Sequence, residues 1–191
     1  MKKITTNLDK FQYFYPYTVN IVGAQFKEQI NYMACAWHTA LSFDPPLFGA
    51  LISKKRLTHQ VISQAGEFTV NFIGFDQVKL SAQMGRISGH DTDKIKEFQV
   101  ELAPAKKIRS PILARSYVCL ENKLLDIRPF GDHDLFVGEV LAVHEDEGCF
   151  NQDGALDVAK IHPLLYLGSD LYITIAPESL QHVLPKLGSD I

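Results

Sequence analysis

The chain has 191 residues, a length that suits one domain, and its 46% apolar and 21% charged residues are the balance of a protein with a sizeable packed core. Its net charge of -3 gives no overall basic field, so nucleic acid is not expected as the main partner. The longest apolar run, Pro46 to Ile52, is far shorter than the roughly 20 residues needed to span a bilayer, so no membrane segment is expected.

The cysteines and the start of the chain indicate the compartment. Cys35, Cys119 and Cys149 are an odd number of cysteines at long spacing, which predicts neither a disulfide framework nor a metal knuckle. The lysines near the start are not followed by an apolar run, so they do not form a secretory signal. We therefore expect a cytoplasmic protein.

The first part of the chain predicts a β-hairpin and a buried strand. Residues 17–24 are rich in β-branched side chains, 25–29 predict a polar turn, and 30–35 predict a strand that pairs back. Asp44-Pro45-Pro46 then forces an extended or turning chain. Leu47 to Ile52 is apolar throughout, as expected of a strand buried on both faces.

Three helices are expected in the middle of the chain. Apolar side chains recur at helical spacing over 58–65, where Thr58 is placed to cap the start and Gly66 to end the helix. Residues 76–86 and 91–98 predict two more, the second with acidic side chains in its first turn.

The remaining segments are mostly strands, which are expected at 67–73, 116–128, 134–144, 164–168 and 171–176. Residues 99–111 are expected to form a loop, and Pro129-Phe130-Gly131-Asp132 predicts a hairpin turn. Strands outnumber helices and follow one another mostly in hairpin order. The sequence therefore predicts an antiparallel β-barrel with a few helices, in a single domain with a core at about 10–176 and a tail from 177 to 191, which can be helical.

Several well-known catalytic motifs are absent from the sequence. It contains no G-x-G-x-x-G, G-x-x-x-x-G-K-[ST], G-x-S-x-G or H-E-x-x-H pattern. Potential metal ligands cluster only at His90-Asp91-Thr92-Asp93, which a capped helix start explains better. No metal site is expected.

The segment Ser53 to Thr58 carries the clearest signal for a ligand. It contains Lys, Lys, Arg and two hydroxyls between a buried strand and a helix. A helix N-terminus leaves backbone N–H groups unpaired and carries partial positive charge, so these side chains there make a good phosphate site. The alternative is a solvated basic turn.

A second signal is the segment Asn31 to His38. The small residues Ala34, Cys35 and Ala36 allow a flat ligand to approach the backbone closely, and Trp37 can form a wall for an aromatic ring. The alternative is that Trp37 belongs to the core.

Two further residues are ambiguous when taken alone. Lys94 alone is best explained by a surface ion pair. His133, at the mouth of a buried strand, can face a pocket, but such a histidine is more often a turn residue that hydrogen-bonds the backbone.

Taken together and in order, these segments resemble the flavin-reductase-like FMN-binding family, and more closely its flavoredoxin-type branch. The matching pieces lie between about Tyr17 and Tyr172 and are Asn31 to Trp37, Phe43-Asp44-Pro45-Pro46, Ser53 to Thr58, Gly66 to Asn71, Ser88-Gly89 with Asp93-Lys94, Gly131-Asp132-His133, and His162 to Tyr166. The resemblance implies a split β-barrel that forms a homodimer, with FMN bound near the subunit contact.

The resemblance also implies which residues form the site. The implied FMN-binding residues are Asn31, Ala34, Cys35, Ala36, Trp37, Ser53, Arg56, Thr58, Asn71, Phe72 and Lys94, of which Ser53, Arg56 and Thr58 would hold the phosphate. His133 and Tyr166 are implied close to the redox-active ring, where they would order a second substrate or move a proton.

The expected function is therefore that of an FMN-dependent oxidoreductase. NAD(P)H or a redox protein would supply the electrons, and the acceptor is not specified by the sequence. Two alternatives stay open: a reductase that uses FMN as a dissociable substrate for a partner monooxygenase, and a flavin-binding module without turnover.

Overall fold

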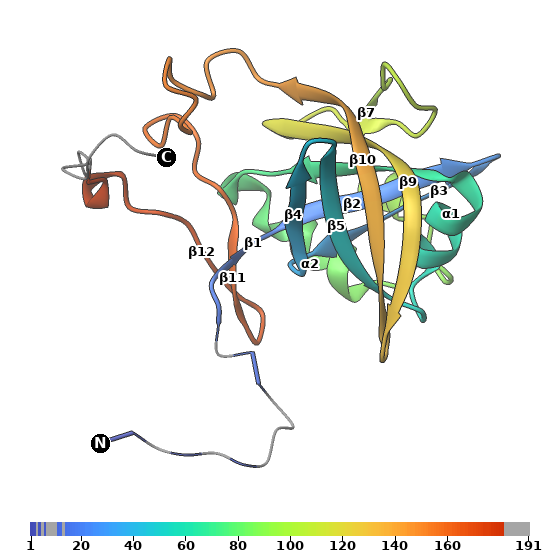
Figure 1. Ribbon diagram of the computed structural model, residues 1–191, viewed down its shortest axis with the longest axis horizontal. Coiled ribbons are helices and arrows are strands. Elements are labelled where there is room, and N and C mark those ends of the chain that lie inside the picture. The colour runs from blue at the N-terminus through green and yellow to red at the C-terminus, as the bar shows by residue number, and fades with distance from the viewer. Residues whose placement is uncertain (3, 5, 7–10, 13, 182–191) are drawn as a thin grey trace.

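The fold is built around one large antiparallel sheet, seen in a computed structural model that describes residues 1–2, 4, 6, 11–12 and 14–181 (Figure 1). The seven strands, in their order across the sheet, are β3 (Gln29–Cys35), β2 (Asn20–Phe26), β6 (Glu67–Phe72), β9 (Val118–Phe130), β10 (His133–Glu145), β5 (Pro46–Ser53) and β4 (His38–Phe43). Every neighbouring pair is antiparallel, as the hairpin order of the sequence predicts.

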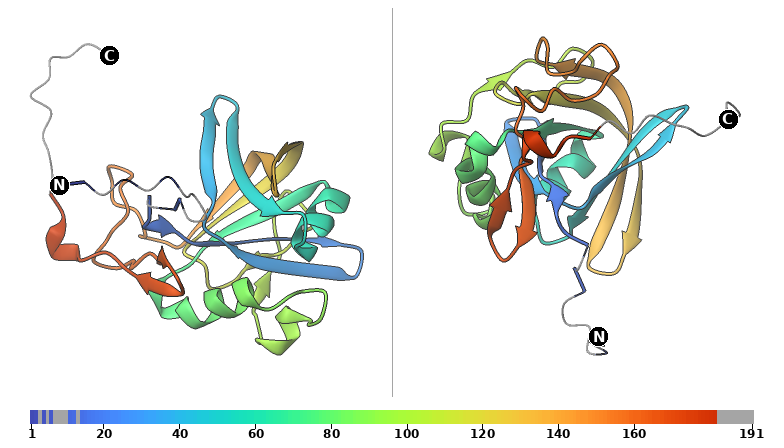
Figure 2. Two further views of the ribbon diagram at one scale, coloured as in Figure 1. Left: turned by 90° about the horizontal axis from the view of Figure 1, so that it is seen from below. Right: turned by 90° about the vertical axis from the view of Figure 1, so that its left-hand side faces the viewer.

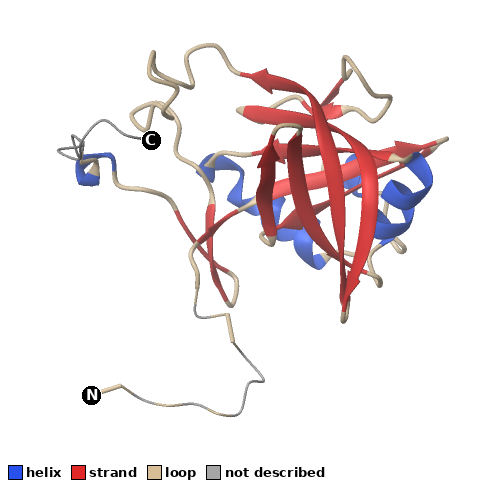
Figure 3. Cartoon of the chain, in the orientation of Figure 1, coloured by secondary structure: helices blue, strands red, loops and turns tan. Residues whose placement is uncertain are grey.

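Two small sheets accompany the large one (Figure 3). The first consists of β1 (Tyr17–Thr18), β11 (Leu165–Gly168) and β12 (Leu171–Ile173), and the second pairs β7 (Leu102–Ala103) with β8 (Ile112–Leu113). The first sheet projects from the larger body in Figure 1.

The large sheet curls until its two edge strands approach each other. β3 and β4 are consecutive in the chain, and the link between them contacts β5: the Leu51 N–H donates to the Trp37 carbonyl at 2.9 Å, and the Cys35 thiol donates to the same carbonyl at 3.3 Å. No ladder joins β3 to β4 among the described residues. The architecture is the predicted antiparallel split β-barrel, with β4 and β5 rising from it as a projecting hairpin (Figure 2, blue to cyan).

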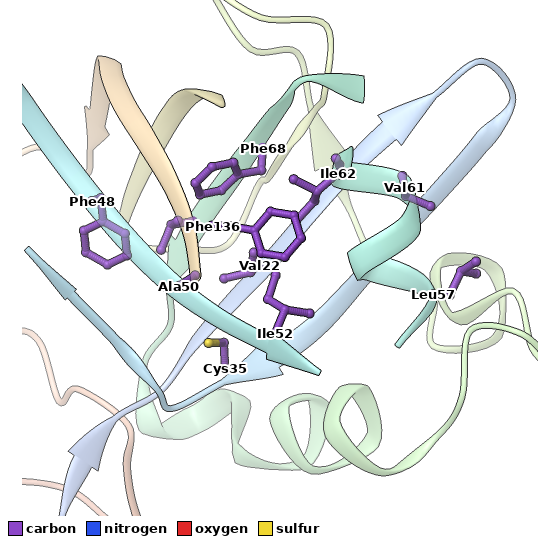
Figure 4. Close-up of a cluster of buried hydrophobic side chains, with 12 residues drawn as sticks. Val22, Cys35, Phe48, Ala50, Ile52, Leu57, Val61, Ile62, Phe68 and Phe136 are labelled. Carbon is purple, nitrogen blue, oxygen red and sulfur yellow. The ribbon is translucent and has the colours of Figure 1, made fainter. Parts of the chain in front are cut away.

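The interior of the barrel is filled by side chains from β2, β5, β6, β10 and the helix α1 (Leu57–Ala65) (Figure 4). Burying one such aliphatic or aromatic side chain stabilises a fold by roughly 1.5–3 kcal/mol. Val61 and Ile62 of α1 are fully buried, and in Figure 4 Ile62 lies beside the ring of Phe136. The apolar face of α1 therefore closes one end of the barrel.

A second apolar cluster lies on the other side of β2 and β3. It includes Ile21, Tyr32 and Met84, the last from α2 (Val78–Arg86), which follows a 3₁₀ turn at Phe75–Gln77. This confirms the helix predicted at 76–86. No helix in the part of the chain that the structure describes is long and apolar enough to cross a membrane.

The two ends of α1 test the capping residues that the sequence predicts. Gly66 ends α1 as predicted, at a φ of 69° that favours glycine, with its N–H bonded to the Ile62 carbonyl at 3.0 Å. The predicted cap at Thr58 is wrong: Arg56 is the N-cap residue and makes no side-chain cap, and Thr58 lies inside the helix.

The helix predicted at 91–98 is much shorter than expected. Asp93 caps it by accepting a hydrogen bond from the Lys96 N–H at 3.2 Å, and α3 spans only Lys94–Glu97. The segment before Asp93 forms turns, so Asp91 does not begin the helix.

The long hairpin of β9 and β10 is confirmed, but its turn is shorter than predicted. Pro129 and Phe130 pair with Asp134 and His133, so Gly131 and Asp132 alone make the turn, with Gly131 at a φ of 66°. β4 had no counterpart in the predicted elements. In the tail, a 3₁₀ turn spans Pro177–Ser179, and residues 182–191 lie outside the described part.

Candidate functional site

A pocket of about 560 Å³ opens at the split of the barrel. This volume falls within the range of about 300–1,000 Å³ that is usual for small-molecule and cofactor sites. Ten of the thirteen predicted site residues line it: Asn31, Ala34, Cys35, Ala36, Trp37, Ser53, Arg56, Thr58, Lys94 and His133. The split in the sheet thus coincides with the site.

Six parts of the chain converge on this pocket. β3 and its link to β4 supply one wall, and the first turn of α1 supplies another. Ser53 ends β5 directly opposite His133, the first residue of β10, so the antiparallel register brings these two side chains together. The link after α2 and the start of α3 complete the pocket.

Lys94 is the most unusual residue of the pocket. Its side chain is only 4% exposed, and its ammonium donates to the Met84 carbonyl at 3.1 Å. Burial, together with the nearby Arg56, lowers the pKa of Lys94 to about 8. Among the described residues no carboxylate pairs with Lys94, Arg56 or Lys55. A buried cation without an anion is costly, so this end of the pocket is suited to an anionic ligand.

The start of α1 strengthens the same end of the pocket. Its first turn has no side-chain cap, which leaves backbone N–H groups and the positive end of the helix dipole for a ligand. The Thr58 hydroxyl accepts a hydrogen bond from the Asn31 amide at 2.6 Å. Having accepted this bond, the hydroxyl still has its own hydrogen to donate.

Gly89 holds Asn31 in place from the other side. A Cβ at residue 89 would lie 2.1 Å from the Asn31 side-chain oxygen, so only glycine fits against this amide. Asn31, Thr58 and Gly89 therefore form one packed unit.

Asp134 lies just outside the pocket and neutralises other charges. Its carboxylate accepts from the His59 ring at 2.8 Å and pairs with the Lys54 ammonium at 3.3 Å. The hydrogen bond from His59 holds the pKa of Asp134 below its usual value. Lys54 is therefore paired with Asp134, whereas Lys55 and Arg56 line the pocket.

The opposite end of the pocket is flat and largely uncharged. The Trp37 and His133 rings lie 5.0 Å apart between centroids, and the Trp37 indole N–H donates to the Tyr15 hydroxyl at 3.4 Å. Trp37 is half-buried and lines the pocket, so it is not a purely internal core residue. Ala34 and Ala36 leave room for a planar ligand.

Cys35 lines the pocket as an un-ionised thiol. Burial raises the pKa of this thiol to about 12. Its sulfur donates to the Trp37 and Leu51 carbonyls at 3.3 and 3.9 Å. The thiol therefore fixes the backbone of the flat wall and is not activated as a nucleophile.

Asn71 and Phe72 do not line this pocket, contrary to what the resemblance implies. The Asn71 amide donates to the Ile21 carbonyl at 2.8 Å and its oxygen accepts from the Leu113 N–H at 2.9 Å, so its polar groups are used inside the fold. The Phe72 ring packs against His38 and Phe48.

Tyr166 also lies outside the lining of the pocket. It belongs to β11, where its ring lies 5.4 Å from Tyr15 and 5.1 Å from Tyr172. Because Tyr15 accepts the hydrogen bond from Trp37, Tyr166 is linked to the pocket through one intervening side chain.

The pocket also includes residues that were not among the predicted site residues: Met33, Leu51, Lys55, Leu57, Ile87, Ser88 and Gly89. Ser88-Gly89 belongs to the segments that carry the resemblance, and Lys55 lies within the basic turn, so both offered a signal. The apolar lining residues offered no signal in the sequence, because apolar side chains of a core and of a pocket wall follow the same pattern.

Comparison with known proteins gives concordant results. The family model described as the flavin reductase like domain matches residues 12–174. An FMN-binding protein from Thermus thermophilus, solved with bound 1-cyclohex-2-enone, is 37% identical over 95% of this chain and 99% of that chain, with a TM-score of 0.84. A flavoredoxin from Methanosarcina acetivorans is 28% identical over 99% of this chain and 97% of that chain, with a TM-score of 0.82. The reductase subunit of a flavin-dependent monooxygenase from Mycobacterium tuberculosis is 28% identical over 145 residues, which are 76% of this chain and 68% of that protein.

Proposed function

The chain belongs to the flavin reductase-like domain family, and from this premise we propose that it binds FMN in the pocket at the split of the barrel and works as an FMN-dependent oxidoreductase. The proposal rests above all on the buried Lys94 beside Arg56, two cations with no carboxylate partner among the described residues. A phosphate monoester is the anion that fits this end, and a planar ring fits the other.

The phosphate end has groups to hold such an ester. Arg56 and Lys55 can donate from the turn, Lys94 from α3, and the backbone at the start of α1 adds further N–H groups. The Thr58 hydroxyl, which accepts from Asn31 and lines the pocket, can donate its own hydrogen to the same phosphate. Since a phosphate monoester carries roughly -1.5 to -2 charge at neutral pH, these cations balance it.

At the other end, bound FMN would supply the hydride and electron transfer. The small residues 34–36 let the backbone approach the ligand, and Trp37 shields one side of it. The Nδ1 atom of His133 pairs with the Asp132 carboxylate at 2.9 Å, which leaves Nε2 as the atom that would hold or move a proton. We assign Tyr166 to positioning, through Tyr15 and Trp37.

The electron donor is NAD(P)H or a redox protein in this proposal. A second candidate function is that of the reductase component of a two-component monooxygenase, which is favoured by the similarity to the Mycobacterium tuberculosis reductase subunit. The two functions differ in whether FMN stays bound between turnovers.

A spectrum of the purified protein tests the proposal. We expect flavin absorbance that survives dialysis and bleaches on anaerobic titration with NADH or NADPH. Flavin that is bleached but lost on dialysis would favour the reductase component, and bound flavin that neither nucleotide reduces would indicate a carrier reduced by another protein. Protein that neither carries nor takes up FMN would refute the proposal.

We also propose that the protein is a cytoplasmic homodimer. Its three cysteines are buried free thiols, as is usual in a reducing compartment. Phe43, at the tip of the β4–β5 hairpin, is 97% exposed, and Phe130 and Val143 of the long hairpin are 58% and 57% exposed. Exposed apolar side chains of this size support an interface with a second copy.

A further inference from the structure

A second hollow, of about 450 Å³, adjoins the phosphate end of the pocket. The pocket and the hollow share Asn31, Leu57 and Gly89 in their lining. Asn31 is the residue that donates to Thr58, whereas Trp37 and His133 line the pocket alone. The two spaces therefore meet where the phosphate would lie, and not at the ring end.

The charges in these two spaces have opposite signs. The pocket contains Lys55, Arg56 and Lys94. The hollow is lined by the carboxylates of Glu28, Asp91 and Asp93 together with His90, and its described lining includes no lysine or arginine. The cations thus suffice for one phosphate, and the space beyond them is acidic.

Two of the three carboxylates have no structural role in the described residues. Asp93 caps α3 through its bond with the Lys96 N–H, so it serves the fold. Glu28 and Asp91 are exposed, and their side chains make neither an ion pair nor a hydrogen bond in the described part of the chain. Their charges therefore act directly on whatever enters the hollow.

We infer that Glu28 and Asp91 are specificity-determining residues that restrict the site to a flavin monophosphate. This inference rests on the proposed function. A flavin dinucleotide such as FAD carries a second phosphate next to the first, and in the adjoining hollow that phosphate would meet carboxylates without a cation to balance it. Like charges in such proximity repel, and the repulsion weakens as salt rises because the Debye length falls from about 10 Å at 0.1 M to about 3 Å at 1 M.

The test compares FMN, FAD and riboflavin binding to the full-length chain stripped of flavin, by quenching of flavin fluorescence. The wild-type chain should bind FMN at least about tenfold more tightly than FAD. In the double variant Glu28→Gln/Asp91→Asn, FAD should bind about threefold or more tighter in low salt, and this gain should largely vanish at about 0.5 M salt. Riboflavin, which has no phosphate, should bind the variant and the wild type equally.

The control is Asp153→Asn/Glu178→Gln, which removes two exposed carboxylates that line neither space. It changes the net charge equally, so an equal gain in FAD affinity there would overturn the inference in favour of a general charge effect. The inference is also overturned if FAD binds the wild type as tightly as FMN, or if the Glu28/Asp91 variant leaves FAD affinity unchanged. Failure of all three flavins to bind the wild type would instead refute the proposed function.

Discussion

Lys94 is a buried cation of the pocket whose pKa is lowered by burial and by Arg56. In the folded chain its pKa is lowered to about 8 from the ordinary 10.5. Between these values the unfolded chain binds more protons than the folded one, so Lys94 makes the flavin-free protein more stable as pH rises through this window. Denaturant unfolding at pH 8 and pH 10 should show this increase in the wild type and not in Lys94→Met.

The same residue should control FMN affinity. Lys94→Met removes the charge and keeps the length of the side chain, and it should weaken FMN binding by about tenfold or more, the usual loss for a hydrogen bond to a charged group. Riboflavin affinity should stay within about twofold, since it has no phosphate. Lys96→Met, on the exposed side of α3, is the matched control. Equal effects of both variants on FMN would contradict the phosphate assignment.

Arg56 and Thr58 should act together on the phosphate. Arg56→Ala/Thr58→Ala should weaken FMN binding by roughly 3 kcal/mol, because two charge-assisted hydrogen bonds are lost. Thr58→Ala alone should also lower the free energy of unfolding by about 1–3 kcal/mol, because the Asn31 amide loses its partner in a buried place. Thr58→Ser retains the hydroxyl and should change neither quantity much. Isothermal titration and chemical unfolding measure the two effects.

Among the elements, the link between α2 and α3 has the tightest packing requirement at the site. Gly89→Ala should weaken FMN binding and destabilise the fold by about 1–3 kcal/mol, since the new methyl group would displace Asn31. Gly85→Ala is the control, because its methyl group would lie 3.5 Å from Ala34 in ordinary contact and within a helix that favours alanine. A neutral Gly89→Ala would show that Asn31 is not held by this link.

The small sheet of β1 and β11 offers a test of remote positioning. Tyr166→Ala removes the ring that packs on Tyr15, and it should slow turnover with NAD(P)H more than it weakens FMN binding. Tyr166→Phe keeps the ring and should retain most of the turnover. Steady-state kinetics and FMN titration separate the two effects, and the reverse pattern would contradict the assignment of Tyr166 to positioning.

The elements also show what the sequence can and cannot reveal. Gly66 and the basic turn after β5 are local signals: Gly66 ends α1 as predicted, and the basic turn lines the pocket. The pairing of Asn31 with Thr58 and the burial of Lys94 arise from segments far apart in the chain, so no local pattern encodes them. β4 was missed because its side chains lack a clear apolar alternation.

For the whole molecule, the exposed apolar side chains offer a test of the proposed homodimer. Phe43→Glu should convert a dimer into monomers, because a charge at an apolar interface is left unpaired. Phe43→Tyr retains the aromatic area and should stay dimeric. Light scattering after size-exclusion chromatography measures the mass, and a dimeric Phe43→Glu protein would place the interface elsewhere.

The gap between β3 and β4 connects the proposed ligand to the stability of the whole barrel. No ladder joins these two strands among the described residues, and FMN bound as proposed would lie against the link that carries Cys35 and Trp37. Any ligand that binds only the folded chain raises its stability with concentration. We therefore expect added FMN to raise the melting temperature of the protein with concentration, and flavin-free chains to be cleaved faster by added protease.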